Sequence, residues 1–153
     1  MTVKAIPDGY AAVTPYLVMK NASKAIDFYK QVFDATERLR MDAPGGKIGH
    51  AELEIGDSLI MLADESPEMG FVGPETIGGT PVTLMLYVED VDARFRRAID
   101  AGAKELRAVQ DQFYGDRSGT LTDPFGHVWT IGTHIEDVSP EEMSRRMEAM
   151  MGK

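Results

Sequence analysis

The chain repeats itself at a spacing of 69 residues, and this repeat limits the folds that it can adopt. At this shift, hydrophobic residues and helix-starting residues of the two halves coincide: Leu17 with Leu86, Asn21 with Asp90, Ile26 with Phe95, and Leu62 with Ile131. An accidental match would not keep its register over so many positions. The sequence therefore predicts two copies of one structural module.

Each half shows the same order of elements, namely a strand, a helix and three further strands. In the first half we expect strands at 14–19, 36–41, 48–55 and 58–63, with a helix capped by Asn21. In the second half we expect strands at 82–88, 105–110, 115–123 and 127–133, with a helix capped by Asp90. We predict one α+β domain over residues 1–153: modules at 10–64 and 82–134, an exposed connector at 65–81, and a helical tail at 135–153.

The alternation of side chains along each predicted strand separates two faces. Large apolar side chains such as Leu17, Leu62 and Trp129 fall on one face, which we expect to lie under the helices. The opposite, open face carries Thr, Tyr and Met side chains, a mixture that suits the wall of a ligand cavity.

Composition excludes several classes of function. The formal net charge is −9, which disfavours binding to nucleic acid and to an anionic membrane surface, because both partners are themselves negative. The chain has no cysteine, which excludes disulfides, thiolate metal sites and thiol nucleophiles. We find neither a signal peptide nor an apolar span long enough to cross a bilayer, and expect a soluble cytoplasmic protein.

Several motifs resemble those of a known family. They are Thr14-Pro15-Tyr16-Leu17-Val18-Met19, Ala25-Ile26-Asp27-Phe28-Tyr29 and Asp123-Pro124-Phe125-Gly126-His127-Val128-Trp129. With these the chain resembles the vicinal oxygen chelate superfamily, which includes glyoxalase I, extradiol dioxygenases, fosfomycin-resistance enzymes and bleomycin-resistance proteins. The stretches His50–Leu53, Leu86–Asp92 and Phe113–Gly119 further resemble its PhnB-like branch. The resemblance implies the glyoxalase/bleomycin-resistance fold: two tandem βαβββ modules that form a curved, cup-shaped mixed sheet with helices on the outside.

The resemblance also implies where a metal would be bound. In metal-using members each module supplies one ligand from its first strand and one from its last, and these positions correspond here to Thr14, Met61, Thr83 and Thr130. Hydroxyl and thioether groups are poor ligands for zinc, nickel or iron. We therefore expect no metal at the usual site, and no cofactor.

Two sets of open-face residues are candidates for a site. His50 and Glu52 lie two apart on one predicted strand and are the candidate catalytic pair, acting as acid and base or in a relocated metal site; a hydrogen-bonded pair on an exposed sheet is the alternative. The candidate ligand-binding residues are Tyr16, Met61, Met85, Tyr87, Arg117 and Thr130. Arg117 could instead form an ion pair with Asp116 or Glu52, and the aromatic and methionine side chains could instead contact a partner subunit.

The leading hypothesis is a protein that binds a small organic molecule without a metal, in the manner of bleomycin-resistance proteins. The alternative is a lyase or isomerase that uses His50 and Glu52. A third hypothesis is a structural or regulatory protein with a vestigial cavity. The methionines of the tail helix need burial, and family members commonly dimerise, so we expect a homodimer.

Overall fold

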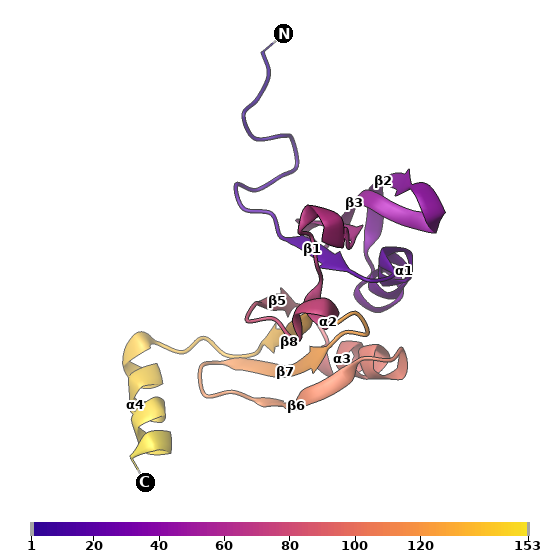
Figure 1. Cartoon of the computed structure of the whole chain (residues 1–153). Helices are drawn as coiled ribbons and strands as arrows, with labels where there is room; N and C mark the ends of the chain where they lie inside the picture. Colours follow the sequence, from indigo (N-terminus) through magenta and orange to yellow (C-terminus); the bar gives the residue numbers. More distant parts are fainter. Residues whose placement is uncertain (1, 153) are drawn as a thin grey trace. The chain divides into compact units, whose positions relative to one another are not determined.

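The computed structural model describes residues 2–152, so residues 1 and 153 of the predicted domain lie outside the described part. The chain divides into two compact units. The first contains the residues up to Pro81 together with Pro124–His127, and the second contains Val82–Asp123 and the residues from Val128 onward. Each unit is built around one four-stranded sheet (Figure 1).

The first unit begins with strand β1 (Tyr16–Met19) and helix α1 (Ala22–Phe33). Strands β2 (Thr36–Ala43), β3 (Lys47–Ile55) and β4 (Ser58–Asp64) follow, with a short 3-10 turn η1 (Pro44–Gly46) between β2 and β3. The strand order is β1-β4-β3-β2. Strand β1 runs parallel to β4, and the other pairs are antiparallel.

The second unit repeats this arrangement with β5 (Thr83–Tyr87), α3 (Val91–Asp100), β6 (Lys104–Asp111), β7 (Asp116–Thr122) and β8 (Val128–His134). Its strand order is β5-β8-β7-β6, and β5 is parallel to β8. Helix α4 (Pro140–Met151) ends the chain. The α+β fold with two tandem βαβββ modules is thus confirmed.

The register of the sheets reproduces the repeat seen in the sequence. Tyr16 lies opposite Met61 in the first sheet, and Met85 lies opposite Thr130 in the second, which is the same pair moved by the repeat spacing. Burial follows the predicted alternation, because Leu17 and Met19 are buried whereas Tyr16 is exposed. The open faces are therefore those deduced from the strand pattern.

The helix starts show both agreement with the expected caps and a departure from them. The side chain of Asp90 accepts a hydrogen bond from the backbone N–H of Ala93, as expected of a cap. Asn21 is the N-cap residue of α1, as predicted, and its carbonyl oxygen accepts the N–H of Ala25. Its backbone is left-handed (φ 59°), however, and its side chain makes no cap hydrogen bond. The N–H of Ala22 is bound instead by Asp64 from the end of β4, at 3.0 Å.

The segment between the modules, which we predicted to be an exposed connector, is exposed over most of its length but belongs to the first unit and contains short elements of its own. It contains a 3-10 turn η2 (Pro67–Met69), a bridge between Ser66 and Phe71, and the short helix α2 (Pro74–Ile77). Pro74 is buried, and so is Gly73. Glu65 holds this segment in place, because its carboxylate accepts hydrogen bonds from the N–H of Gly73 (2.7 Å) and the hydroxyl of Thr76 (2.6 Å).

Across residues 2–152, no helix is both long enough and apolar enough to span a bilayer.

Candidate ligand-binding site

Three side chains on the open face of the first sheet form a continuous hydrogen-bonded chain. The hydroxyl of Tyr16 on β1 lies 2.8 Å from Nδ1 of His50 on β3, and Nε2 of His50 lies 2.8 Å from a carboxylate oxygen of Glu52. His50 and Glu52 share a face because they are two residues apart on one strand. The structure thus brings together the predicted catalytic pair and adds Tyr16 to it.

The chemistry of the three side chains shows which atom carries the proton in each of these two hydrogen bonds. An ionised carboxylate can only accept a hydrogen bond, so Nε2 of His50 carries the proton that binds Glu52. In a neutral imidazole Nδ1 is then an acceptor, and it receives the hydroxyl proton of Tyr16. Partial burial raises the pKa of the Tyr16 hydroxyl, which keeps the phenol protonated.

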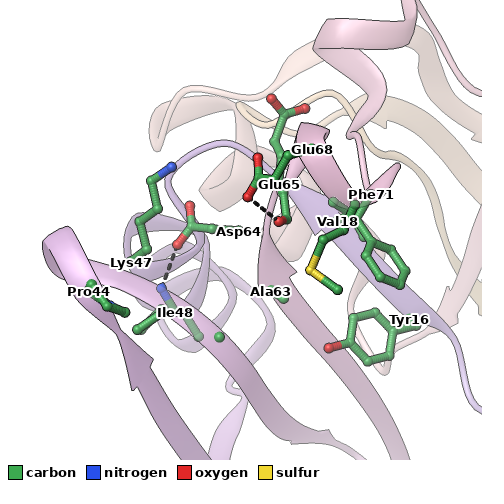
Figure 2. A pocket seen from close by; sticks show the side chains of 14 residues that line it. Tyr16, Val18, Pro44, Lys47, Ile48, Ala63, Asp64, Glu65, Glu68 and Phe71 are labelled. Carbon is green, nitrogen blue, oxygen red and sulfur yellow. Dashed lines mark hydrogen bonds between the residues drawn. The ribbon is translucent and has the colours of Figure 1, made fainter.

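A cavity of about 520 Å³ begins beside Tyr16 and extends toward η1 and the segment after β4. Figure 2 shows Tyr16, Val18 and Phe71 on one side of this space and Pro44, Lys47 and Ile48 on the other. Its walls combine apolar side chains with a few charged ones: Tyr16, Val18, Ala43, Pro44, Ile48, Ala63, Met69 and Phe71, with Lys47, Asp64, Glu65 and Glu68. Size and lining are those of a typical small-molecule pocket.

The charged groups around the cavity are fixed to different degrees. Asp64 is tied to the backbone, because its two oxygens accept hydrogen bonds from the N–H groups of Ala22 and Ile48. The carboxylate of Glu65 is bound by Thr76 and Gly73, which lower its pKa. Lys47 extends along the cavity rim in Figure 2. The site therefore presents both anionic and cationic groups to a ligand.

Sequence reasoning identified Tyr16 as a ligand-binding residue but missed most of the other lining residues. Met69 and Phe71 lie in the segment that we expected to be exposed, and both side chains are exposed. They nevertheless line the cavity, where the segment folds back at the Ser66–Phe71 bridge. Alternation along β1 and β4 could have indicated Val18 and Ala63, since both fall on the open face. Met61, also predicted as a ligand residue, is half-buried on the open face of β4, outside the cavity lining.

The open face of the second sheet carries a different polar cluster. The hydroxyl of Tyr87 donates to the carboxylate of Asp116 at 2.7 Å, and this interaction raises the pKa of Tyr87. The other oxygen of Asp116, which is buried, lies 2.9 Å from Nδ1 of His134. Of the predicted ligand residues here, Met85 and Tyr87 are exposed, and Thr130 forms a hydrogen bond with Thr120.

The side chain of Arg117 contacts helix α3 and takes no part in the hydrogen bonds of the Tyr16–His50–Glu52 or Tyr87–Asp116–His134 groups. Its guanidinium group binds both carboxylate oxygens of Asp92 (2.8 and 2.9 Å) and one of Asp111 (3.0 Å). The ion pair expected with Asp116 or Glu52 is therefore formed with other acids. These contacts lower the pKa of Asp92.

The two other histidines have structural contacts. Nε2 of His127 lies 2.9 Å from the carbonyl oxygen of Val18. His134 lies between Asp116 and Asp137, whose hydrogen bonds raise the pKa of the imidazole, with Asp116 contributing most.

This arrangement of His134 makes stability depend on pH. A pKa that is higher in the folded than in the unfolded protein stabilises the fold below the unfolded value of about 6.5, and this contribution disappears as the pH rises through the folded value. We expect the melting temperature to fall between about pH 6 and pH 8 in the wild type, and to fall less in His134→Gln. Differential scanning calorimetry over this range measures both, and identical pH profiles for the two proteins would contradict the role given to His134.

Thr14, Met61, Thr83 and Thr130, the four positions to which the resemblance assigns metal ligands, carry groups that are poor ligands for zinc, nickel or iron. They hold three hydroxyl groups and a thioether, and the hydroxyl of Thr130 is engaged with Thr120 at 2.9 Å. Within the part of the chain that the structure describes, no three His, Asp or Glu side chains are grouped so that they could hold a metal.

Comparison with known proteins identifies the family. Residues 10–131 match the Glyoxalase/Bleomycin resistance protein/Dioxygenase superfamily, and the chain belongs to this superfamily. It is 45% identical over 141 residues to the uncharacterized protein Rv0887c of Mycobacterium tuberculosis, a match that covers 90% of this chain and 83% of that one.

Solved structures agree with this assignment. The crystal structure of TioX from Micromonospora sp. ML1 is similar with a TM-score of 0.62 and 28% identity, covering 82% of this chain and 99% of that one. The X-ray structure of the Arabidopsis thaliana gene product At5g48480 is similar with a TM-score of 0.67 and 27% identity. The match covers 80% of this chain and 98% of that one.

Proposed function

We propose that the protein binds a small organic molecule in the cavity of the first module, between Tyr16 and Phe71. The single observation that carries this proposal is the cavity of about 520 Å³, with apolar walls and a few fixed polar groups. Pockets of this size enclose most of the surface of a small ligand, and the polar groups orient it. The Tyr16 hydroxyl supplies one such group, because His50 fixes the direction of its proton.

The family offers both binders and enzymes as precedents, and the PhnB-like branch is the finer assignment that we propose. It is supported by the three sequence stretches named above and by a fold shared with a PhnB protein from Bacillus cereus, at 20% identity and a TM-score of 0.63. At that identity the likeness extends to the fold alone. Binding is proposed to proceed without the metal that other members use.

Metal analysis tests this last point. We expect purified protein to contain less than one tenth of an equivalent of any divalent ion, and EDTA to leave the melting temperature unchanged, because the family positions offer no imidazole or carboxylate donor. The measurement is elemental analysis by mass spectrometry alongside thermal denaturation. A stoichiometric ion that survives dialysis would refute metal-free binding.

The homodimer and the cytoplasmic location predicted from the sequence stay predictions. Met147, Met150 and Met151 on α4 are exposed in the single chain, which agrees with a need for a partner surface. Light scattering after size-exclusion chromatography gives the mass directly.

Filling the cavity tests the proposed site. Ala63 lies on its wall, and Ala63→Phe would place an aromatic ring in the space that a ligand needs. We expect compounds that raise the melting temperature of the wild type to lose at least tenfold in affinity, about 1.4 kcal/mol or more. A screen of small organic compounds by thermal shift, followed by NMR titration, measures this.

The matched control is Leu59→Phe, on the same strand and the same face but outside the cavity lining. It should bind the same compounds as the wild type. Equal binding by Ala63→Phe and Leu59→Phe would place the ligand elsewhere.

A further inference from the structure

We propose that the ligand of this cavity is a zwitterion with an apolar body, of the kind of an α-amino acid with an aromatic side chain. This inference rests on the proposed binding site and adds the chemical class of its ligand. The apolar body lies between Tyr16 and Phe71, and the ammonium and carboxylate groups of the ligand meet the charged side chains at the opposite end of the cavity.

The charged side chains of the cavity gather at one end of it. Figure 2 shows one lysine and three acids there: Lys47, Asp64, Glu65 and Glu68. A second cavity of about 350 Å³ adjoins this end, since it shares Lys47, Asp64 and Glu65 with the first, and it adds Lys20. The polar end of the site therefore carries two cationic and three anionic side chains.

The two lysines have no partner among residues 2–152. The ammonium groups of Lys20 and Lys47 take part in no hydrogen bond and no ion pair with those residues. Each ammonium group has three N–H donors, so both lysines keep their full capacity to bind an anionic group. The carboxylate of a ligand suits them, because hydrogen bonds between charged groups are stronger than those between neutral ones.

The acids at this end stay ionised and can bind a cationic group. Hydrogen bonds from Thr76 and, second, from Gly73 lower the pKa of Glu65, and the hydrogen bond from Ser66 (2.7 Å) lowers the pKa of Glu68. Both bonds to Glu65 go to the same oxygen atom, and its second oxygen accepts none from the described residues. That oxygen is available to the ammonium group of a ligand.

A ligand with a single charge would match only part of this end. An amine would be repelled by Lys20 and Lys47, and an acid would be repelled by Glu65 and Glu68, because like charges brought together cost free energy. A molecule that carries an ammonium and a carboxylate group on one carbon offers each sign its counterpart. The mixture of signs therefore favours a zwitterion over an amine or an acid of the same shape.

The other end of the cavity suits an apolar side chain. Tyr16 and Phe71 are 47% and 55% exposed, so the surface of both rings is available for a ligand to cover. Val18 and Ile48 continue the apolar wall toward the charged end. Aromatic rings pack well against one another, and burial of apolar surface is favourable. We therefore expect phenylalanine to bind more tightly than glycine, which has no side chain.

Three probes that share a phenyl ring and differ in their charged groups test the inference. They are L-phenylalanine, phenethylamine, which lacks the carboxylate, and 3-phenylpropanoate, which lacks the ammonium group. In NMR titrations we expect L-phenylalanine to shift the amide resonances of Ile48 and Ala63. Its affinity should exceed that of either other probe by about five- to tenfold, because each of them loses one set of charged hydrogen bonds.

Substitutions at the charged end should act on one charge of the ligand at a time. Lys47→Met should weaken binding of L-phenylalanine and 3-phenylpropanoate by about three- to tenfold, and should not weaken phenethylamine. Glu68→Gln should weaken L-phenylalanine and phenethylamine, and should not weaken 3-phenylpropanoate. Lys24→Met, on α1 but outside both cavity linings, is the matched control for Lys47→Met and should leave all three affinities unchanged.

The outcomes separate failure of this inference from failure of the proposed site. Equal affinity of L-phenylalanine and a singly charged probe would overturn the zwitterion and leave the binding site intact. The same conclusion would follow if L-phenylalanine shifted no resonance while another compound bound the wild type but not Ala63→Phe. If every compound that binds the wild type also binds Ala63→Phe equally well, both proposals are refuted.

Discussion

Gly115→Ala is expected to lower the free energy of unfolding by about 2–4 kcal/mol, because two penalties coincide at this position. Gly115 has φ +103°, a conformation that costs a residue with a Cβ atom about 1–2 kcal/mol. A Cβ atom there would also overlap the carbonyl oxygen of Glu136 and approach Val138. The carbonyl of Gly115 itself accepts hydrogen bonds from the N–H groups of Ile135 (2.9 Å) and Glu136 (3.0 Å).

Gly45→Ala is the matched control for this prediction. Gly45 has a similar positive φ of +80°, but no atom lies within 4 Å of the Cβ that would be added. Gly45→Ala should therefore lower the free energy of unfolding by the conformational penalty alone, about 1–2 kcal/mol. Urea denaturation compares the two variants. Equal losses of unfolding free energy would show that the overlap with Glu136 does not contribute to the cost of Gly115→Ala.

Asp64→Ala is the second substitution for which a large loss is expected, about 2–4 kcal/mol. Its carboxylate accepts the N–H of Ala22 at the start of α1 (3.0 Å) and the N–H of Ile48 on β3 (2.7 Å). Bonds to a charged acceptor contribute more than neutral ones, and a negative charge at a helix N-terminus is favourable. Removing the carboxylate would leave both donors without this partner.

The repeat supplies the control for Asp64. At the corresponding position of the second module, the hydroxyl of Thr133 accepts the N–H of Val91 at the start of α3 (3.0 Å) and donates to the carbonyl of Val88 (2.8 Å). Thr133→Val keeps the shape but loses a neutral acceptor, so we expect a smaller loss of about 1 kcal/mol. Thermal and urea denaturation of both variants measure the difference, and a larger cost for Thr133→Val would contradict this account of the helix starts.

The parts of the fold that depend on local periodicity were predictable from sequence. Alternation placed Leu17 and Met19 toward the helix and Tyr16 toward the open face, and the burial of these residues agrees. The predicted repeat is also seen in the strand pairing, because Tyr16 and Met85, which the repeat equates, lie opposite Met61 and Thr130. Such features follow from the two-residue period of a strand and need no knowledge of distant contacts.

The features that escaped prediction depend on residues far apart in sequence. The side-chain acceptor at the start of α1 is Asp64 and not the neighbouring Asn21, whose backbone is left-handed and whose side chain makes no cap hydrogen bond. Arg117 is neutralised by Asp92 on α3, a partner that strand alternation alone does not indicate.

The candidate site was predictable only in part for the same reason. His50 and Glu52 could be paired from their spacing, whereas the contact of His50 with Tyr16 depends on the position of β1 in the sheet. Phe71 became a wall of the cavity because the segment after β4 folds back. Composition had predicted only an exposed connector there.

The measurement that tests the central claim most directly is a crystal structure of the protein with a compound that raises its melting temperature. We predict electron density for that compound between Tyr16 and Phe71, bordered by Ala63 and Ile48 and in hydrogen-bonding distance of the Tyr16 hydroxyl. Density confined to the exposed face of Met85 and Tyr87, with the cavity beside Tyr16 filled only by water, would contradict the assignment of the ligand site to the first module.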